Sequence, residues 1–230
     1  MTLPILHTPT FKLEIPSTKK DYKFRPFLVK EEKILIQAAE SGNFSEMVNA
    51  ACQIITNCSF GEIDGGELAM FDVQDLFIRI REKSIGETQE FSLTCGSCSE
   101  TTSIDFDLSL LKVQGLDEIP NNKIDLGNEI GLILKYPASS VMAEGEEIDD
   151  DDIIIESIDY IYSGEETHYP EDVTEEELAE FIDSISIEKM GEIREFFYSM
   201  PKLEHIIDYK CPKCEEQQKI SINGYEHFFV

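Results

Sequence analysis

Two cysteine pairs with the same spacing are the residues of this sequence best suited to chemistry. Cys95 and Cys98 lie in the stretch Cys-Gly-Ser-Cys, and Cys211 and Cys214 lie in Cys-Pro-Lys-Cys. A Cys-x-x-Cys turn brings two sulfurs to one ion, and zinc prefers four ligands in a tetrahedron. The 112 residues between Cys98 and Cys211 weaken this pairing only modestly, since the entropy of loop closure grows with the logarithm of loop length. The spacing predicts one structural zinc ion held by all four cysteines.

Three other readings of the cysteine pairs are open but less favoured. A redox pair needs Cys-x-x-Cys at a helix N-terminus inside a βαβ unit, whereas both pairs lie between strand patterns. A catalytic zinc keeps an open coordination position and usually has histidine ligands. The histidines show neither His-Glu-x-x-His nor His-x-Glu spacing: His7, His168, His205 and His227. Unpaired thiols are the third reading.

The remaining two cysteines are expected to be inert. Cys52 lies beside the apolar stripe of a predicted helix and reads as a small core residue. Cys58 lies just past that helix, near Gly61, where burial is favoured over a role as a fifth ligand. The sequence leaves both roles open.

Strand patterns surround each cysteine pair. Residues 90–94 and 101–108 alternate in polarity on either side of the first pair, and residues 205–210 and 218–223 do so around the second. Each pair therefore occupies the turn of a hairpin, which is the construction of a zinc ribbon. The glycine that usually follows the second cysteine is missing, because Ser99 and Glu215 stand there.

The first third of the chain predicts two short strands and a small helical cluster. The strands fall at residues 11–16 and 21–27, and the first helix spans residues 30–40 before Ser41-Gly42. Asn43 caps a second helix. A third begins at Asp72 and ends at Gly86. We assign residues 1–88 to this N-terminal segment.

Residues 89–230 form the predicted zinc-ribbon region, interrupted by an insertion of about residues 99–210. The insertion contains a hairpin with its turn near Gly127-Asn128, a capping box that opens a helix at Thr174, and a helix over residues 187–198. Residues 153–162 favour a helix, although their isoleucines also allow a strand. The predicted fold class is α+β, with a small helical cluster and antiparallel hairpins that form a split zinc ribbon with a large helical insertion.

Charge limits the classes of partner. The chain carries 47 Asp and Glu against 19 Lys and Arg, a formal net charge of −28. Such a charge repels phosphate backbones and anionic membranes and suits a partner with a basic face. The acidic run at residues 144–152 lacks the spacing of a calcium loop and reads as a solvated loop or a helix N-terminus.

Targeting segments and enzyme motifs are not recognised. No apolar run is long enough to span a bilayer, and the N-terminus lacks the pattern of a secretory signal. We therefore expect a reducing cytoplasm, where Cys-x-x-Cys indicates metal rather than a structural disulfide. Neither a phosphate-binding glycine loop nor a Gly-x-Ser-x-Gly elbow occurs, so we expect no enzyme and no small-molecule substrate.

Three segments resemble a known family. They are FRPFLVKEEKIL (24–35), FDVQDLFIRIREKSIGE (71–87) and the opening LPILHTPTFKLEIPST (3–18), so the likeness covers roughly the first hundred residues. They resemble the baseplate hub subunits and hub assembly proteins of T4-type contractile-tailed bacteriophages. Within them Arg25, Lys30 and Lys33 are expected to be solvated, with a contact surface as the alternative.

The resemblance implies a non-enzymatic component of the baseplate hub, or a factor for its assembly, that acts through protein–protein contacts. Its partners would be other phage hub and tail proteins, with no nucleic acid and no membrane. It would work in the host cytoplasm during assembly, and the resemblance leaves open whether it stays in the virion tail baseplate. The alternative function is a zinc-ribbon module for nucleic acid or transcription, which the charge opposes.

Overall fold

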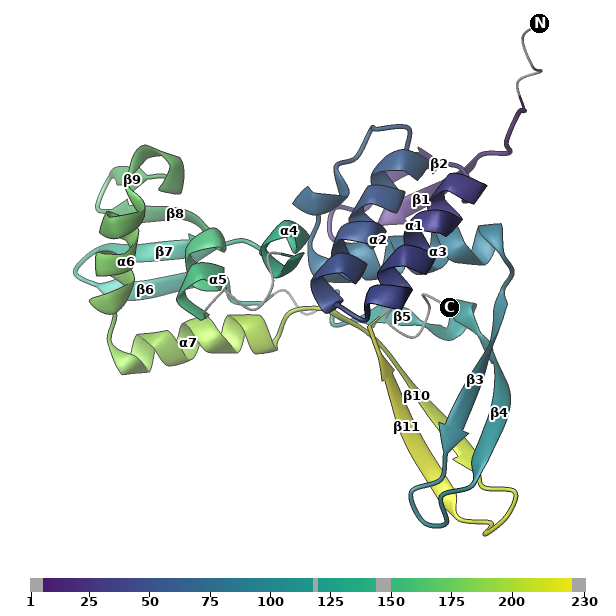
Figure 1. The fold of residues 1–230 in the computed structure, drawn as a ribbon. Helices are drawn as coiled ribbons and strands as arrows, with labels where there is room; N and C mark the ends of the chain where they lie inside the picture. Colours follow the sequence, from purple (N-terminus) through teal and green to yellow (C-terminus); the bar gives the residue numbers. More distant parts are fainter. Residues whose placement is uncertain (1–5, 118–119, 144–149, 225–230) are drawn as a thin grey trace, which may run out of the picture.

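The computed structural model describes residues 6–117, 120–143 and 150–224 and divides them into three parts (Figure 1). We call them the helical lobe (residues 11–84), the arm (residues 88–107 and 202–223) and the sheet lobe (residues 123–198). The arm consists of two hairpins far apart in sequence, whose turns meet at its far end. The fold is a mixture of helices and antiparallel sheets, as predicted.

The helical lobe contains one hairpin and three helices. They are β1 (Phe11–Ile15), β2 (Lys20–Phe24), α1 (Val29–Ser41), α2 (Phe44–Cys58) and α3 (Met70–Ser84), with a short 3-10 turn at Gly65–Glu67. Gly42 ends α1 with a left-handed φ of 63°, and the Asn43 side chain accepts the N–H of Ser45 at the start of α2. The predicted end of α1 at Gly42 and the predicted cap of α2 at Asn43 are both confirmed. Both features depend only on local backbone chemistry.

Asp72 does not cap α3, contrary to the prediction. The helix begins at Met70, and Asp72 lies in its first turn with 1% of its surface exposed. Its Oδ1 accepts the N–H of Ser17, at 2.9 Å, from the β1–β2 turn. Burial raises the pKa of Asp72, and the hydrogen bond from Ser17 opposes that shift. The carboxylate therefore joins the hairpin to α3.

Arg25 is buried, contrary to the expectation of a solvated side chain. Only 6% of the residue is exposed, and its guanidinium donates to both carboxylate oxygens of Glu31 at 3.0 and 3.1 Å. Burial raises the pKa of Glu31, but the bond from Arg25, the N–H of Leu28 and the Arg25 and Lys30 charges outweigh it and lower that pKa. Arg25 is thus part of the folded interior, whereas Lys30 and Lys33 are exposed.

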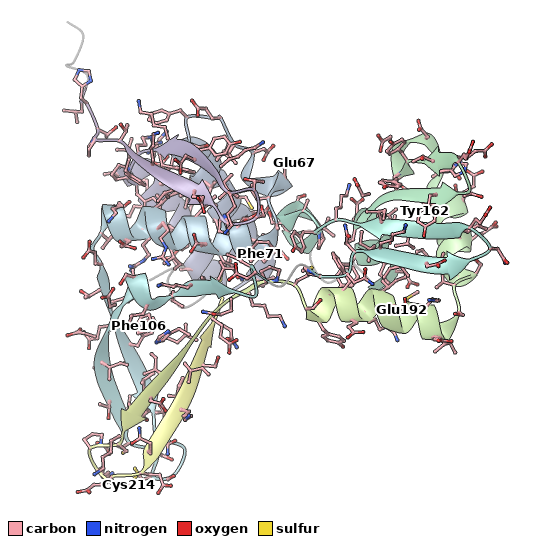
Figure 2. The ribbon with its side chains drawn as sticks, turned by 180° about the vertical axis from the view of Figure 1, so that it is seen from behind. Glu67, Phe71, Phe106, Tyr162, Glu192 and Cys214 are labelled. Carbon is pink, nitrogen blue, oxygen red and sulfur yellow. The ribbon has the colours of Figure 1, made fainter. Side chains whose placement is uncertain are left out.

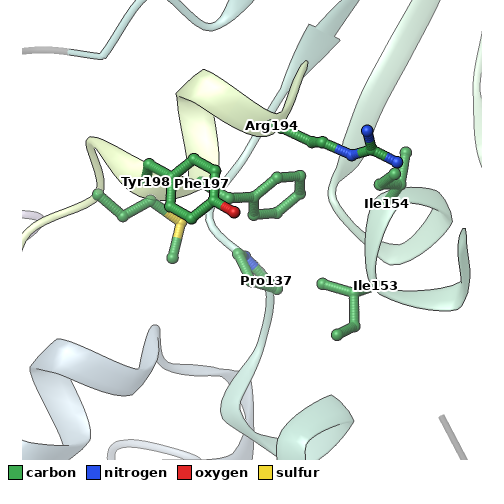
Figure 3. Close-up of a pocket in the computed structure, with 7 residues that line it drawn as sticks. Pro137, Ile153, Ile154, Arg194, Phe197 and Tyr198 are labelled. Carbon is green, nitrogen blue, oxygen red and sulfur yellow. The ribbon is translucent and has the colours of Figure 1, made fainter. Parts of the chain in front are cut away.

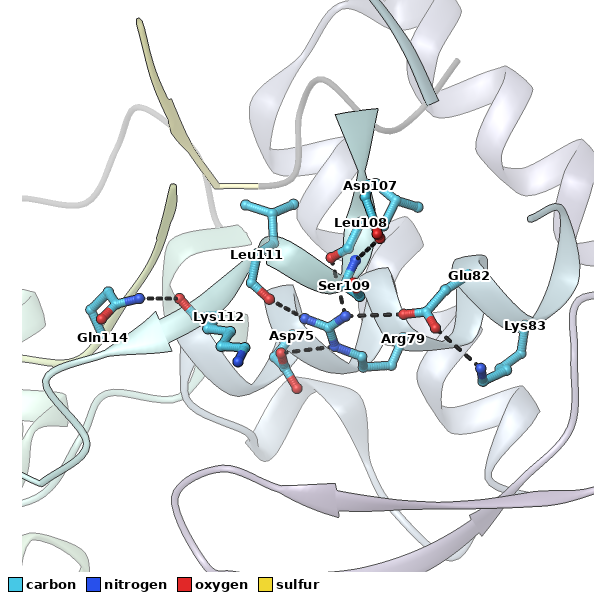
Figure 4. A network of polar contacts seen from close by, with 10 residues as sticks. All are labelled: Asp75, Arg79, Glu82, Lys83, Asp107, Leu108, Ser109, Leu111, Lys112 and Gln114. Carbon is cyan, nitrogen blue, oxygen red and sulfur yellow. Dashed lines mark hydrogen bonds and ion pairs between the residues drawn. The ribbon is translucent and has the colours of Figure 1, made fainter. Parts of the chain in front are cut away.

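The base of the arm is held to the helical lobe by Arg79 of α3 (Figure 4). Its guanidinium pairs with Asp75 at 3.3 Å and Glu82 at 3.0 Å on its own helix. It also donates to the carbonyl oxygens of Leu108 and Leu111, in and after the 3-10 turn Leu108–Leu110 that follows the first hairpin. Arg79 therefore joins α3 to the segment that follows the first hairpin, beside the hydrophobic cluster that the arm shares with the lobe.

The arm contains β3 (Thr88–Thr94), β4 (Thr101–Asp107), β10 (Lys202–Lys210) and β11 (Gln217–Asn223). The two hairpins belong to different sheets, since β3 pairs only with β4, whereas β10 lies between β11 and β5 (Lys112–Gln114). Apolar side chains at alternate positions fill the space between them. At the base, Phe106 contacts the Phe91 ring at 5.7 Å and the His205 ring at 5.3 Å between centroids.

The sheet lobe is a four-stranded antiparallel sheet with helices. Its strands follow in the order β6 (Lys123–Gly127), β7 (Ile130–Leu134), β8 (Ile158–Ser163) and β9 (Glu166–His168), and its helices are α5 (Asp150–Glu156), α6 (Glu175–Asp183) and α7 (Ile187–Tyr198), with a 3-10 turn at Pro170–Asp172. The insertion is therefore not mainly helical. The stretch predicted as one helix over residues 153–162 is divided, because α5 ends at Glu156 and β8 begins at Ile158.

The lobes have separate hydrophobic clusters that are joined through α4 (Ser139–Ala143). The buried hydroxyl of Ser139 donates to the Gly65 carbonyl at 2.9 Å and lies 3.2 Å from the Cys52 sulfur. Tyr136 contacts Phe71 of the helical lobe edge to face and stacks on Phe196 of the sheet lobe. The predicted division of the chain after residue 88 stays a prediction.

Candidate metal centre

The two cysteine turns have the same backbone geometry. In the first turn, the N–H of Ser99 donates to the Cys95 carbonyl at 2.9 Å, and the N–H of Cys95 donates to the Glu100 carbonyl at 2.8 Å. Around Cys211 the two equivalent bonds measure 3.0 and 2.9 Å. Each turn therefore presents its two cysteines in the same way.

The missing glycines do not change this geometry. Ser99 and Glu215, which occupy the positions after each second cysteine, have left-handed φ angles of 56° and 59°. Residues other than glycine adopt this conformation at an energetic cost. Both turns accept that cost at the same position, so the two turns share one backbone conformation.

The four sulfur atoms come together at the far end of the arm, where Figure 2 labels Cys214. All four sulfurs lie within 4.8 Å of one another, and the pairs Cys95–Cys214 and Cys98–Cys211 are each separated by 3.7 Å. Four sulfurs about 2.3 Å from one tetrahedral zinc would be about 3.8 Å apart. A disulfide requires about 2.05 Å, so these are free thiols grouped at the spacing of metal ligands.

The first cysteine of each turn is more deeply buried than the second. Cys95 and Cys211 are each 1% exposed, whereas Cys98 is half-buried and Cys214 is exposed. The backbone N–H groups of Cys214 and Lys213 lower the pKa of Cys211 to about 7. For Cys214, the N–H of Glu216 lowers the pKa, but desolvation and the neighbouring cysteines outweigh it and raise the pKa to about 12. A metal would therefore displace protons when it binds the complete set.

Polar contacts between the two turns hold the sulfur cluster from outside. Lys213 of the second turn pairs with Glu100 of the first at 2.7 Å. Gln218 accepts the N–H of Gly96 at 3.3 Å and so joins β11 to the first turn. Backbone and side-chain contacts of this kind orient ligands and fix their spacing.

The other two cysteines lie in the helical lobe and not at the sulfur cluster. Cys52 is buried beside Ser139, as expected for a small core residue. Cys58 is completely buried, accepts a long hydrogen bond of 3.7 Å from Arg25, and has its pKa raised to about 12 by burial. Neither residue belongs to the group of four, so the reading of Cys58 as a fifth ligand is not supported.

The acidic run provides no described metal site. Residues 144–149 lie outside the described residues, and residues 150–152 form the first turn of α5. Within the described residues (6–117, 120–143 and 150–224), one group of three or more possible metal ligands lies within reach of a single ion. That group consists of the four arm cysteines. None of the described helices is both long and apolar enough to cross a membrane.

A family model described as T4 bacteriophage base plate protein matches residues 8–230. The chain belongs to this family. The match covers the helical lobe, the arm and the sheet lobe, and therefore extends well beyond the segments that carried the resemblance. No curated protein and no solved structure matches the chain. Membership of the T4 base plate family supports a structural role in the phage tail baseplate and contacts with other base plate proteins.

Proposed function

We propose that this base plate family member is a component of the central hub of the baseplate, or a factor that assembles the hub, and that it acts without catalysis. The family match over residues 8–230 carries the baseplate part of the proposal. The hub part rests on the resemblance of residues 3–18, 24–35 and 71–87 to hub proteins. Such a protein meets its partners in the host cytoplasm during assembly and either remains in the virion baseplate or leaves it.

The second part of the proposal is that one zinc ion staples the arm as a zinc ribbon split by the insertion. Cys95, Cys98, Cys211 and Cys214 would hold the ion, and their 3.7 Å spacings suit a tetrahedral thiolate set. Zinc is the metal that such a set selects most commonly among divalent ions, because thiolate is a soft ligand. Four protein ligands leave no position for a water or substrate, which favours a structural role over a catalytic one.

Charges on the arm favour a protein partner over nucleic acid. The stretch around the second cysteine pair contains three lysines that could have contacted phosphates. Each of them is paired with a carboxylate: Lys210 with Glu215, Lys213 with Glu100 and Lys219 with Asp208. Counterion release from nucleic acid requires basic side chains that can reach phosphates, so these pairs oppose the alternative function as a nucleic-acid module.

Native mass spectrometry of the tagged chain from phage-infected cells, prepared without chelator, tests both parts. We expect one zinc per chain and attached hub or tail proteins. A Cys98→Ser chain from the same infection serves as the control for the metal. Recovery of the wild-type chain with nucleic acid and no tail protein would contradict the hub role, and recovery without metal, with disulfides or free thiols, would contradict the zinc ribbon.

A further inference from the structure

An open apolar hollow lies between α5 and α7 of the sheet lobe (Figure 3). Its volume is about 310 Å³. It is lined by Pro137, Ile153, Ile154, Arg194, Phe197, Tyr198 and Met200. Ile154 is buried, but Ile153, Phe197 and Met200 are only half-buried and Tyr198 is 77% exposed. A concave group of partly exposed apolar side chains of this volume can receive an apolar side chain of another molecule.

The opposite side of α5 borders a second hollow of a different chemistry. This hollow has a volume of about 470 Å³ and lies between α5 and α6. Its lining includes four carboxylates, from Asp152, Glu156, Glu175 and Glu176. Grouped like charges repel one another, and a cation that enters such a hollow relieves that repulsion. The seven-residue helix α5 therefore separates an apolar hollow from an acidic one.

The distribution of charge over the chain identifies the kind of partner. Residues 123–199 contain 23 Asp and Glu and 4 Lys and Arg, so this third of the chain carries −19 of the total charge of −28. A second copy of the chain would bring the same negative charge and be repelled, and so would nucleic acid. A protein segment with Lys or Arg would be attracted to the lobe and guided to it.

Arg194 sets the orientation of such a segment. Its side chain extends from α7 across the edge of the apolar hollow, and its guanidinium lies next to Ile154 of α5 (Figure 3). A basic side chain of the partner would be repelled there and attracted to the carboxylates across α5. The apolar side chain of the partner would accordingly enter the hollow beside Tyr198, with its basic side chains over Glu175 and Glu176.

We propose that these two hollows together form a docking surface, the α5 surface, for a basic amphipathic segment of another baseplate protein. This inference rests on the proposed function for the identity of the partner as a baseplate protein. The chemistry of the segment follows from the surface itself: at least one large apolar side chain flanked by Lys or Arg.

The test uses the full zinc-loaded chain and a short dansyl-labelled helical peptide of leucine and lysine, titrated by fluorescence anisotropy. Tyr198→Ala should weaken binding about fivefold or more, because an exposed aromatic at a contact site contributes strongly to affinity. Ile187→Ala is its control, since Ile187 lies on the same helix, is 90% exposed and does not line the hollow. A peptide with serine in place of leucine should bind more weakly and should not distinguish Tyr198→Ala from the wild type.

Charge is tested by two double variants of equal net charge. Glu175→Gln with Glu176→Gln should weaken binding about threefold and flatten its salt dependence. Glu165→Gln with Glu166→Gln, at the exposed β8–β9 turn of the same lobe, should leave binding near the wild-type value. Equal effects of the two double variants would mean that only the overall charge of the lobe attracts the peptide, which overturns the α5 surface.

Two further results would also overturn it. Failure of the wild-type chain to bind the peptide would show that the two hollows do not attract a basic amphipathic segment. Undiminished recovery of baseplate proteins with Tyr198→Ala from infected cells would also overturn the α5 surface and leave the hub role standing. Loss of that recovery with Tyr198→Ala, but not with Ile187→Ala, is the expected result. If even the wild-type chain recovers no baseplate protein, the proposed function fails.

Discussion

Replacement of one arm cysteine by serine tests whether the two cysteine turns share one ion. Cys98 and Cys211 are 113 positions apart in sequence, and their sulfurs are 3.7 Å apart. A cross-link that closes a loop of this length removes about 5 kcal/mol of conformational entropy from the unfolded chain, by the relation used for disulfides. Cys98→Ser breaks the cross-link and should remove stability of that order.

The expected change in thermal midpoint follows from the size of the chain. The entropy of unfolding is about 2.1 cal/mol/K per residue, so a cooperative transition of the 230 residues should shift down by about 10 °C. Differential scanning calorimetry measures this shift, and metal analysis of the same samples measures the zinc. A chelator should lower the wild-type midpoint by a similar amount and should have little effect on Cys98→Ser.

A double variant distinguishes one shared ion from two independent pairs. Cys98→Ser combined with Cys211→Ser should lose about as much stability as Cys98→Ser alone, because each change removes the same ion and such losses are not additive. Cys52→Ala is the control, since Cys52 is buried outside the cluster and this variant should keep the response to chelator. A Cys98→Ser chain with the wild-type midpoint and one zinc would refute the reasoning.

Three other predictions concern the helical lobe and the sheet lobe. Glu31→Ala leaves the Arg25 charge buried and should cost about 3–5 kcal/mol in denaturant unfolding, whereas Arg25→Met with Glu31→Leu should restore most of it. The pKa of Glu31 is lowered in the folded chain, so ionised Glu31 raises the free energy of unfolding above its ordinary pKa, and this gain is lost as the pH falls through the lowered value. The free energy of unfolding of Glu31→Ala should therefore fall less steeply with acid than that of the wild type. Gly65→Ala should cost about 1–3 kcal/mol or more, since a Cβ there would overlap a backbone carbonyl of α2. Gly66→Ala is the control and should cost little, because the nearest atom to its added Cβ lies at 3.4 Å. Equal melting temperatures of the two variants would contradict this prediction. Thr174→Ala should cost about 1 kcal/mol by loss of the capping box of α6, and an unchanged unfolding midpoint would contradict it.

Features with a local cause were predictable from the sequence. The turn chemistry of Gly42 and the capping box at Thr174 depend on residues within one turn of the helix, and the structure confirms both. The bounds predicted for α7, Ile187–Tyr198, are those observed, because Ser186 caps its start and Pro201 follows shortly after its end. The grouping of the four cysteines was predictable for a related reason, since ligand spacing within each turn is local even though the turns are distant.

Features that depend on distant contacts were not predictable. From the sequence, Asp72 was predicted to cap a helix and Arg25 to be an exposed cation, because charged residues are seldom buried. Each is buried against a partner, Ser17 or Glu31, that only the tertiary fold brings close. The prediction of one helix over residues 153–162 failed for another reason. Isoleucines suit both buried helices and strands, so their pattern cannot show where α5 ends and β8 begins.

The position of the insertion shows what a metal bound by the four cysteines would add at the far end of the arm. The sheet lobe enters the chain between the two arm hairpins, and its ends are brought together at the base, where Gln114 of β5 pairs with Lys202 of β10. Because β3–β4 and β10–β11 share no backbone hydrogen bonds, the hairpins are joined by side-chain packing along their length. Apart from the buried Cys95 and Cys211, most residues at the tip are exposed, among them Lys210 and Lys213, so apolar packing contributes less there. An ion bound by all four cysteines would close the hairpins at the end that the strand pairing at the base does not reach, and would so keep the two hairpins together over their whole length.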